Sequence, residues 1–386
     1  MAFTGKATYS AGATLPELAE DIADLVGIVT PYETPLLDHL GDAARSASST
    51  YHEWIEDELL PNTDAINDAT WVDAAADTAF VVDHGARFRI GDQVRPTGSA
   101  ELLLVTGVDT ATNTLTVVRG YGGTTPAALA NDQVLHIVGN AALEGDDAPG
   151  GRFTNRLRKG NWTQIFTAAV RVSGSHVAVR KAAVADEVDL QQHERLRELV
   201  RDLENTVLNG AAPAADAQGS GTVRRTMRGI IPSLATNIFK PNVDGFPADT
   251  DLTEAQLNQA MRTIWERSSS RIDTIVVNGY QKRRINGFIT SGRAFGSGET
   301  TYRDLVSVYE SDFGISRVLL CRSVPANTVL LLDSSRLQVL PLAGRSFHYK
   351  KLASTGDYEA GEIIGEYTLE MRNESAHGVI TGLDVS

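Results

Sequence analysis

Residues 186–209 read DEVDLQQHERLRELVRDLENTVLN, and this stretch predicts one long amphipathic helix. Charged side chains cover most of its circumference, and a single apolar stripe runs along it, formed by Leu196, Leu199, Val200, Leu203 and Val207. Asp186 can cap the first turn, and Gly210 follows the last turn. At about 1.5 Å per residue the helix would be roughly 35 Å long. An apolar stripe of that length needs a sheet to pack against.

The material for that sheet stands on both sides of the helix in the sequence. Runs rich in β-forming residues occupy 163–179 before it and 329–342 after it. We therefore expect an α+β fold in which one long helix crosses a sheet drawn from both halves of the chain.

The composition is that of an ordinary globular protein. A chain of 386 residues, 42% of them hydrophobic, is long enough for two or three domains with real cores. The single cysteine, Cys321, excludes a disulfide framework or a thiolate metal cluster and favours a reducing compartment. The sequence contains no signal-peptide pattern and no run near the ~18 apolar residues of a membrane span, so we expect a soluble protein made in the cytoplasm.

The net charge of −14 is unevenly distributed along the chain. Residues 1–150 carry 23 acidic and 6 basic side chains, a net charge of −17, and residues 151–386 carry 26 acidic and 29 basic side chains, a net charge of +3. An acidic surface often serves only solubility. An acidic half and a slightly basic half in one chain also suit head-to-tail contact between copies.

The N-terminal region has the pattern of an arm followed by a hook. Residues 1–15 are small and polar without periodicity, and Leu18, Ile22, Leu25 and Val26 predict a short amphipathic helix that ends before Thr30-Pro31. The next segment, TPYETPLLDHLG, has a compact apolar cluster that must be buried, either in its own subunit or against another one; the cluster consists of Leu36, Leu37 and Leu40.

A long excursion follows the hook. Residues 49–60, STYHEWIEDELL, have a strand-like pattern that contains Trp54. Residues 78–139 are short β runs separated by turn signals, which predict an inserted β-barrel of about 60 residues. The return strand is 154–162, and its basic residues can pair with acidic residues of the outgoing strand; these are Arg156, Arg158 and Lys159, facing Glu53, Glu56, Asp57 and Glu58. Exposed pairs of this kind are each worth well under ~1 kcal/mol, so they would orient the strands rather than stabilise them.

Two more helices are expected in the second half. Residues 253–268 form a well-marked helix with a Thr253/Gln256 capping box, and 280–289 form a third helix after a buried strand at 274–278. Everything from residue 302 onward consists of short β runs.

Chemistry-bearing motifs are missing from the sequence. It contains no phosphate-binding loop, HExxH motif or nucleophile elbow, and GYGG at 120–123 is a turn signal. The eight histidines are scattered, and the carboxylate pairs Glu362/Glu366 and Asp146/Asp147 are typical of solvated faces. We therefore predict no catalytic residue, no metal ligand and no cofactor, and a protein that is not an enzyme.

The order of several segments resembles the major capsid (major head) protein family of tailed double-stranded DNA bacteriophages. In the first part these are TPYETPLLDHL, TYHEW, TQIFTAAVRVSGS, RDLENTVLNG and RTMRGIIPSLATN; in the second part YESDFGISRVLLCR and LASTGDYEAGEIIGEYTLEMRNESAHGVITGL. The likeness runs through most of the chain in the right order. One departure is Ser354 in LASTGD, where the family pattern would have a basic residue, so any contact made by that side chain is in doubt.

The resemblance implies a tailed-phage major capsid fold and its domains. They would be an N-terminal arm and hook at 1–48, an extended β loop at 49–162 that contains the small barrel at 78–139, a peripheral domain at 163–221 with the spine helix at 186–209, an axial domain at 222–339, and C-terminal strands at 340–386 that return to the peripheral domain.

The implied function is self-assembly into the virion capsid. Hexamers and pentamers would form an icosahedral shell around double-stranded DNA in the cytoplasm of an infected bacterium. A separate scaffolding protein and a portal would be partners, a decoration protein stays open, and no membrane is involved. Residues expected at subunit interfaces are Leu36, Leu37, Leu40, Trp54, Glu53, Glu56, Arg156, Arg158 and Lys159. For the three leucines, burial in the subunit's own core is an equal alternative.

DNA contact is expected to be non-specific, because the largest basic cluster is KRR at 282–284, which also suits a solvated helix face. Two other functions stay open. A non-viral nanocompartment would share the subunit fold and hold a cargo enzyme, and a soluble enzyme would fail to assemble.

Overall fold

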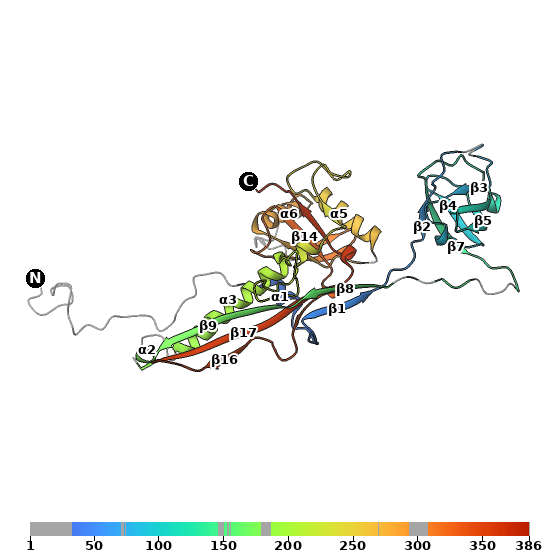
Figure 1. Cartoon of the computed structure of the whole chain (residues 1–386). Helices are drawn as coiled ribbons and strands as arrows, with labels where there is room; N and C mark the ends of the chain where they lie inside the picture. The colour runs from blue at the N-terminus through green and yellow to red at the C-terminus, as the bar shows by residue number, and fades with distance from the viewer. Residues whose placement is uncertain are drawn as a thin grey trace, which may run out of the picture. The chain divides into compact units, whose positions relative to one another are not determined.

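The computed structural model describes residues 33–70, 73, 75–145, 150–152, 154, 156–178, 187–268, 270–292 and 308–385 (Figure 1). The predicted helix at 18–26, the cap at Asp186 and the pair Asp146/Asp147 lie outside the described residues. The chain divides into two compact units, Met1–Trp54 with Arg158–Ser386, and Ile55–Leu157.

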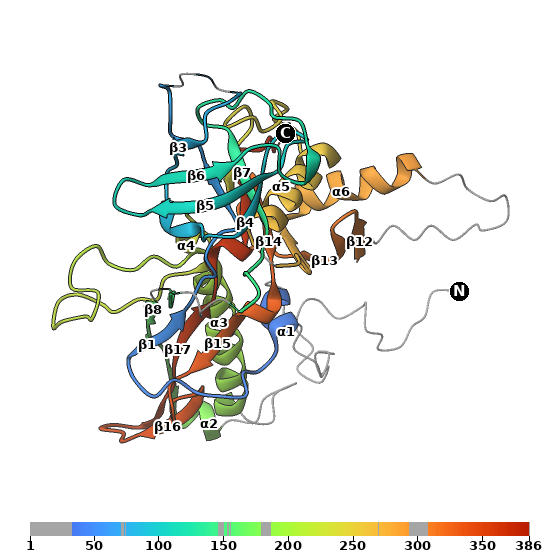
Figure 2. The ribbon, with the colours of Figure 1, turned by 90° about the vertical axis from the view of Figure 1, so that its right-hand side faces the viewer.

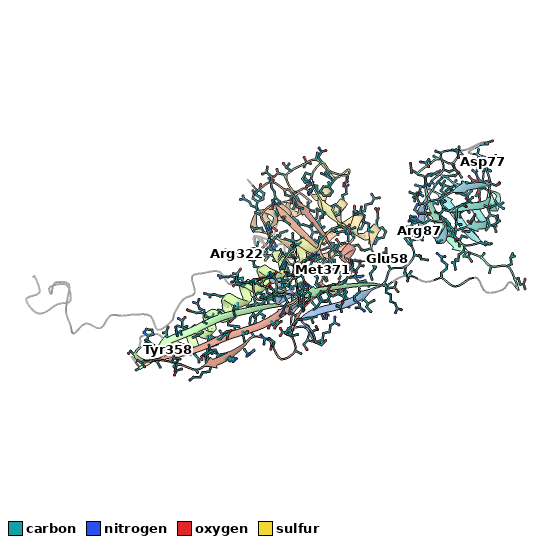
Figure 3. All side chains as sticks on the ribbon, in the orientation of Figure 1. Glu58, Asp77, Arg87, Arg322, Tyr358 and Met371 are labelled. Atoms are coloured by element: carbon teal, nitrogen blue, oxygen red, sulfur yellow. The ribbon has the colours of Figure 1, made fainter. Side chains whose placement is uncertain are left out.

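The long helix and its sheet organise the first unit. α3 (Glu187–Asn209) packs on β9 (Gln164–Ser173) and β17 (Tyr358–Met371), the strand whose two ends are labelled in Figure 3. β17 pairs antiparallel with β9 along one edge and with β15 (Leu337–Pro341) and β16 (His348–Leu352) in succession along the other. The sheet is drawn from both halves of the chain, as predicted. Leu199, Leu203 and Val207 of α3 are buried in its core.

A second, six-stranded sheet lies between two cores. Its order is β10 (Ile238–Phe239), β18 (Gly378–Thr381), β14 (Thr328–Leu332), β11 (Thr274–Val277), β13 (Gly314–Leu320) and β12 (Val308–Ser311). Alternate residues of β14 point into different cores. Leu330 and Leu332 join the core that contains α3. Val329 and Leu331 join the core that contains α5 (Glu254–Arg267) and α6 (Gly279–Gly292), two helices labelled in Figure 2. Burial on both faces explains why β11 and β14 read as unbroken apolar runs.

Helix α5 confirms its predicted start, because Thr253 and Gln256 form the capping box. Short helical turns connect the larger elements: α1 (Pro35–Leu40), α2 (Gly174–Ala178), α4 (Ile230–Ser233), η3 (Ser334–Arg336) and η4 (Glu374–Ala376). Of the C-terminal strands, β16 and β17 lie in the first sheet, and β18 pairs with β14 and β10 of the second sheet.

The second unit contains six short strands in the order β2 (Thr63–Ala65), β7 (Val134–Asn140), β4 (Asp92–Pro96), β5 (Leu103–Asp109), β6 (Thr114–Val118) and β3 (Ala79–Val81), with 3₁₀ turns at Gly85–Arg87 and Tyr121–Gly123. A bridge between Ile66 and Val82 joins the two edge strands. The predicted insert at 78–139 starts too late, since β2 precedes it. Strand β4 was not anticipated, because Gly91-Asp92 and Pro96 resemble turn signals.

Candidate subunit interface

The outgoing and returning strands of the excursion form a two-stranded ribbon, β1 (Tyr51–Glu56) with β8 (Leu157–Trp162). Two of the predicted ion pairs form across it: Glu53 lies 3.7 Å from Arg158, and Asp57 lies 3.6 Å from Arg156. All four side chains are largely exposed, so these pairs contribute little stability. Lys159 is exposed as well, and Glu56 is half-buried.

Aliphatic side chains on and beside the ribbon point into solvent. Leu59 is 90% exposed, Ile55 65% and Leu157 56%, whereas the predicted anchor Trp54 is half-buried, with its ring 6.0 Å from that of His52. Exposed aliphatic side chains of this size are candidates for contact with other molecules. The sequence reasoning missed Leu59 and Ile55, although STYHEWIEDELL places both among charged residues on a two-stranded element that has too few strands for a core.

The base of the ribbon is held by two buried carboxylates of β17. Glu370 is 1% exposed, and its oxygens lie 2.6 Å from Arg45 Nη2, 2.6 Å from His52 Nε2 and 2.9 Å from Arg372 Nε. Such buried carboxylates depend on their partners, because an unpaired buried charge costs several kcal/mol.

Glu366, four residues before Glu370 on the same face of β17, completes the attachment. It is 3% exposed, accepts a hydrogen bond from Thr163 Oγ1 at 2.6 Å, and is paired with Arg225 at 2.6 Å and Arg345 at 2.8 Å. The expectation that Glu362/Glu366 form a solvated pair is therefore wrong for Glu366.

A close approach of aromatic rings reinforces the ribbon base. The rings of Tyr51 and Trp162 lie 4.6 Å apart, and a Cβ on Gly160 would come within 2.7 Å of the Tyr51 ring. Only glycine leaves room for this packing. In the first unit, the direction in which the ribbon leaves the sheet is thus determined by the pairs at Glu366 and Glu370 and by these rings.

The hook packs into its own subunit. Leu36 of α1 is 0% exposed and belongs to the core beneath α3, and Leu37 and Leu40 are partly buried against that core. Leu36 thus lies in the core of its own subunit, which was the alternative to an interface role, and this side chain is not available to a neighbouring subunit. Leu37 and Leu40 keep partly exposed surface.

A buried carboxylate anchors the hook. Glu204 of α3 is 1% exposed; its Oε2 accepts the backbone N–H of Leu37 at 3.2 Å, and its Oε1 accepts the Cys321 thiol at 3.1 Å. Burial raises the pKa of Glu204, with a smaller contribution from the negative charge of Asp38, and burial raises the pKa of Cys321 to about 12. A thiol with so high a pKa is inert as a nucleophile.

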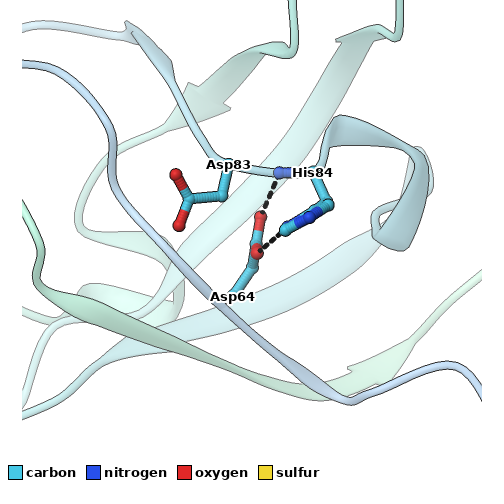
Figure 4. Close-up of side chains that lie close together, drawn as sticks. All are labelled: Asp64, Asp83 and His84. Carbon is cyan, nitrogen blue, oxygen red and sulfur yellow. Dashed lines mark hydrogen bonds and ion pairs between the residues drawn. The ribbon is translucent and has the colours of Figure 1, made fainter. Parts of the chain in front are cut away.

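One group in the described part of the chain has the composition of a metal site, namely Asp64, Asp83 and His84 in the second unit (Figure 4). The Asp64 carboxylate already accepts hydrogen bonds from Arg87 Nη1 at 2.9 Å, from the backbone N–H of His84 at 2.8 Å and from its Nδ1 at 3.1 Å. The guanidinium stands where a cation would bind, so this group stabilises the turn at Gly85–Arg87. Within the described residues, no helix is long and apolar enough to cross a membrane.

The sequence profile of a family described as SU10 major capsid protein matches residues 3–384. No curated protein matches the sequence.

Several solved structures share the fold. The capsid of a native GTA particle has 9% identity and a TM-score of 0.53, over 99% of this chain and 100% of that one. A structure from Microbacterium phage Oxtober96 has 14% identity and a TM-score of 0.51, over 94% and 96% of the two chains. The cyanophage A-1(L) capsid has 12% identity and a TM-score of 0.51, over 96% and 98%. At such identities the likeness concerns the fold alone.

Proposed function

Because this chain belongs to the SU10 major capsid protein family, it is a major capsid protein of a phage, and we propose that its copies assemble as hexamers and pentamers into an icosahedral shell around double-stranded DNA. Closed point-group symmetry lets one set of contacts, each of modest strength, be repeated throughout a shell. The role we propose is structural rather than catalytic.

The observation that carries this proposal is the exposed aliphatic surface at the ribbon, made by Ile55, Leu59 and Leu157. Covering one such side chain contributes about 1.5–3 kcal/mol. A neighbouring subunit is the natural partner for these side chains, because the exposed pair Asp57–Arg156 belongs to the same unit and can be shared with complementary charges of another copy. Glu56 belongs to the same unit, and we propose that Trp54, Glu53, Arg158 and Lys159 of the first unit also contact a neighbouring subunit.

The test compares two exposed leucines. Leu59→Asp places a charge at the proposed contact, and Leu143→Asp changes a leucine that is 78% exposed in the segment after β7 and is not part of the proposed contact. Purified protein, alone and coexpressed with its neighbouring genes, is examined by negative-stain electron microscopy and sedimentation. We expect shells or capsomers from the unsubstituted chain and from Leu143→Asp, and folded subunits without shells from Leu59→Asp. Normal shells from Leu59→Asp would show that the ribbon is not part of the interface. An unsubstituted chain that stays monomeric under every condition would contradict assembly.

The contents of the shell test the remaining partners. We propose a separate scaffolding protein and a portal, assembly in the cytoplasm of the host, and packaged DNA that is contacted without sequence specificity. Extraction of purified particles should yield double-stranded DNA. A cargo enzyme in its place would favour the nanocompartment alternative.

A further inference from the structure

The sequence contains three asparagine–glycine pairs, and the structure places them in three different backbone settings. They are Asn209-Gly210, Asn278-Gly279 and Asn286-Gly287. An asparagine followed by glycine can lose its side-chain amide without an enzyme, because the next backbone nitrogen can attack the side-chain carbonyl carbon and glycine carries no side chain to obstruct it. The attack requires a backbone nitrogen that can approach that carbon, so the local structure decides which pair reacts.

Two of the pairs are held by hydrogen bonds of a helix. Gly210 donates its backbone N–H to the Thr206 carbonyl at 2.8 Å, and the Asn209 amide donates to the Ser323 carbonyl at 2.7 Å. A Cβ on Gly210 would come within 2.5 Å of the Thr206 oxygen, so the backbone is closely enclosed there. Asn286-Gly287 lies inside α6, where the helix uses the backbone N–H groups. Neither glycine nitrogen can move toward its asparagine side chain without breaking a helical hydrogen bond.

The third pair, Asn278-Gly279, stands at the start of α6, the helix labelled in Figure 2. The Asn278 backbone carbonyl accepts the Lys282 N–H at 3.0 Å, which makes Asn278 the residue before the first helical position. The N–H of Gly279 is then one of the four that a helix leaves without an intrahelical partner. Gly279 is exposed, and within the described chain only its own neighbours and helix backbone come within 4 Å of the place that a Cβ would take. The Gly279 nitrogen therefore has room to move.

The Asn278 side chain is turned toward this nitrogen. Its Oδ1 accepts the Gly279 N–H at 2.6 Å, so the carboxamide carbon lies beside the nitrogen that would attack it. Its Nδ2 donates to the Val324 carbonyl at 2.9 Å, which holds the plane of the amide and keeps its oxygen on the side of Gly279. The two reacting groups are thus in contact before the reaction, an arrangement that raises the rate of intramolecular steps.

We propose that Asn278 is a site of spontaneous deamidation in the folded subunit. Water or hydroxide removes the Gly279 N–H proton, the nitrogen bonds to Asn278 Cγ, and the Cγ–Nδ2 bond breaks with release of ammonia, which takes up a proton. A water molecule then opens the cyclic imide. Cleavage of the new bond at Cγ gives aspartate, and cleavage of the original peptide bond to Gly279 gives isoaspartate. The reaction consumes only water and involves no oxidation or reduction.

The products would loosen the junction between β11 and α6. A carboxylate has no N–H to donate, so aspartate loses the hydrogen bond to the Val324 carbonyl and turns a negative charge toward that oxygen. Isoaspartate adds a methylene group to the backbone between α6 and a strand that is buried on both faces. Gln281, which ties the first turn of α6 to the Ala326 and Asp384 carbonyls, would then be displaced. An aged subunit would therefore differ from a new one at this junction.

Peptide mapping of aged, full-length protein tests the site. Purified protein is incubated without denaturant, and isoaspartate is labelled with a radioactive methyl group by isoaspartyl methyltransferase before digestion and mass spectrometry. We expect label in the peptide that contains Asn278, in an amount that is larger at mildly alkaline than at mildly acidic pH, because hydroxide removes the Gly279 proton. Peptides that contain Asn209 or Asn286 should stay nearly unlabelled. In urea, where the three backbone settings are lost, all three pairs should react at similar rates.

A substitution at Gly279 tests the attacking nitrogen. Gly279→Ala adds a Cβ that has open space in the fold and obstructs the approach to Asn278, so the label there should fall several-fold. Gly287→Ala is the matched control, since it adds a Cβ with open space on the same helix and should leave the label at Asn278 unchanged.

Three results would overturn the inference. They are an unlabelled Asn278 in the folded protein, equal label in all three peptides before unfolding, and a Gly279→Ala variant that reacts as fast as the unsubstituted chain. Unassembled subunits suffice for these measurements, so the outcome is independent of the proposed shell.

Discussion

Acid is expected to destabilise this subunit through one buried histidine. His377, between η4 and β18, is 0% exposed; its Nδ1 accepts the backbone N–H of Asp333 at 3.2 Å, and its Nε2 has no hydrogen-bond partner. Burial lowers the pKa of His377 from 6.5 to about 4, although the nearby negative charges of Asp333 and Glu374 favour the protonated form. Between pH 6.5 and 4, His377 is therefore neutral in the folded protein and protonated in the unfolded chain.

The sign and size of the effect follow from this difference. The folded-state pKa is lowered, so the stability contributed by neutral His377 is fully present above pH 6.5 and is lost as the pH falls toward 4. A difference of about 2.5 pKa units corresponds to roughly 3 kcal/mol once the pH is below both values, and to about 2 kcal/mol at pH 5. That is a large part of the 5–15 kcal/mol that stabilises a typical domain.

Urea unfolding of unassembled subunits at pH 7.5, 6, 5 and 4 measures this loss. Other carboxylates also titrate in this range, so the informative quantity is the difference between the unsubstituted chain and His377→Gln at each pH. We expect the difference in free energy of unfolding to shift by about 3 kcal/mol between pH 7.5 and 4 in favour of the variant. His348→Gln, which removes an exposed histidine of β16, should keep the pH dependence of the unsubstituted chain. A difference for His377→Gln that stays constant across the series would refute the reasoning.

Three further outcomes are expected. Burial raises the pKa of Glu204, so the charged form costs stability as the pH rises above the ordinary carboxyl range, and Glu204→Gln should raise the melting temperature more at pH 8 than at pH 5; an equal change at both values would contradict this. Leu36→Asp buries a charge in the core and should give an insoluble or unfolded chain, and folded, soluble subunits that fail only to assemble would return Leu36 to the interface. Glu370→Ala leaves Arg45 and His52 without their partner and should cost about 1–3 kcal/mol in urea unfolding, because the arginine that remains is half exposed to water, with Glu359→Ala as the exposed control near zero.

Much of the candidate interface was within reach of sequence reasoning. Opposite charges on two strands that leave and re-enter the same body predict pairing across them without naming the partners, and the structure pairs Glu53 with Arg158 and Asp57 with Arg156. The burial of the carboxylates of Glu204, Glu366 and Glu370 could not be predicted from the sequence. Their partners stand up to 325 residues away in the chain, as Arg45 does from Glu370, and no local pattern distinguishes a glutamate with a distant guanidinium from one in water.

Residue periodicity and capping sufficed to locate α3 and α5, their apolar faces and the strands that flank them, because a helix depends on neighbours three and four positions away. Burial depends instead on what the fold brings together. Leu36 and Leu59 stand in similar short apolar clusters among charged residues, yet one is 0% exposed beneath α3 and the other 90% exposed at the ribbon. Only the tertiary structure separates the buried leucine from the exposed one, since the surfaces that cover Leu36 come from helix α3 and strands far along the chain.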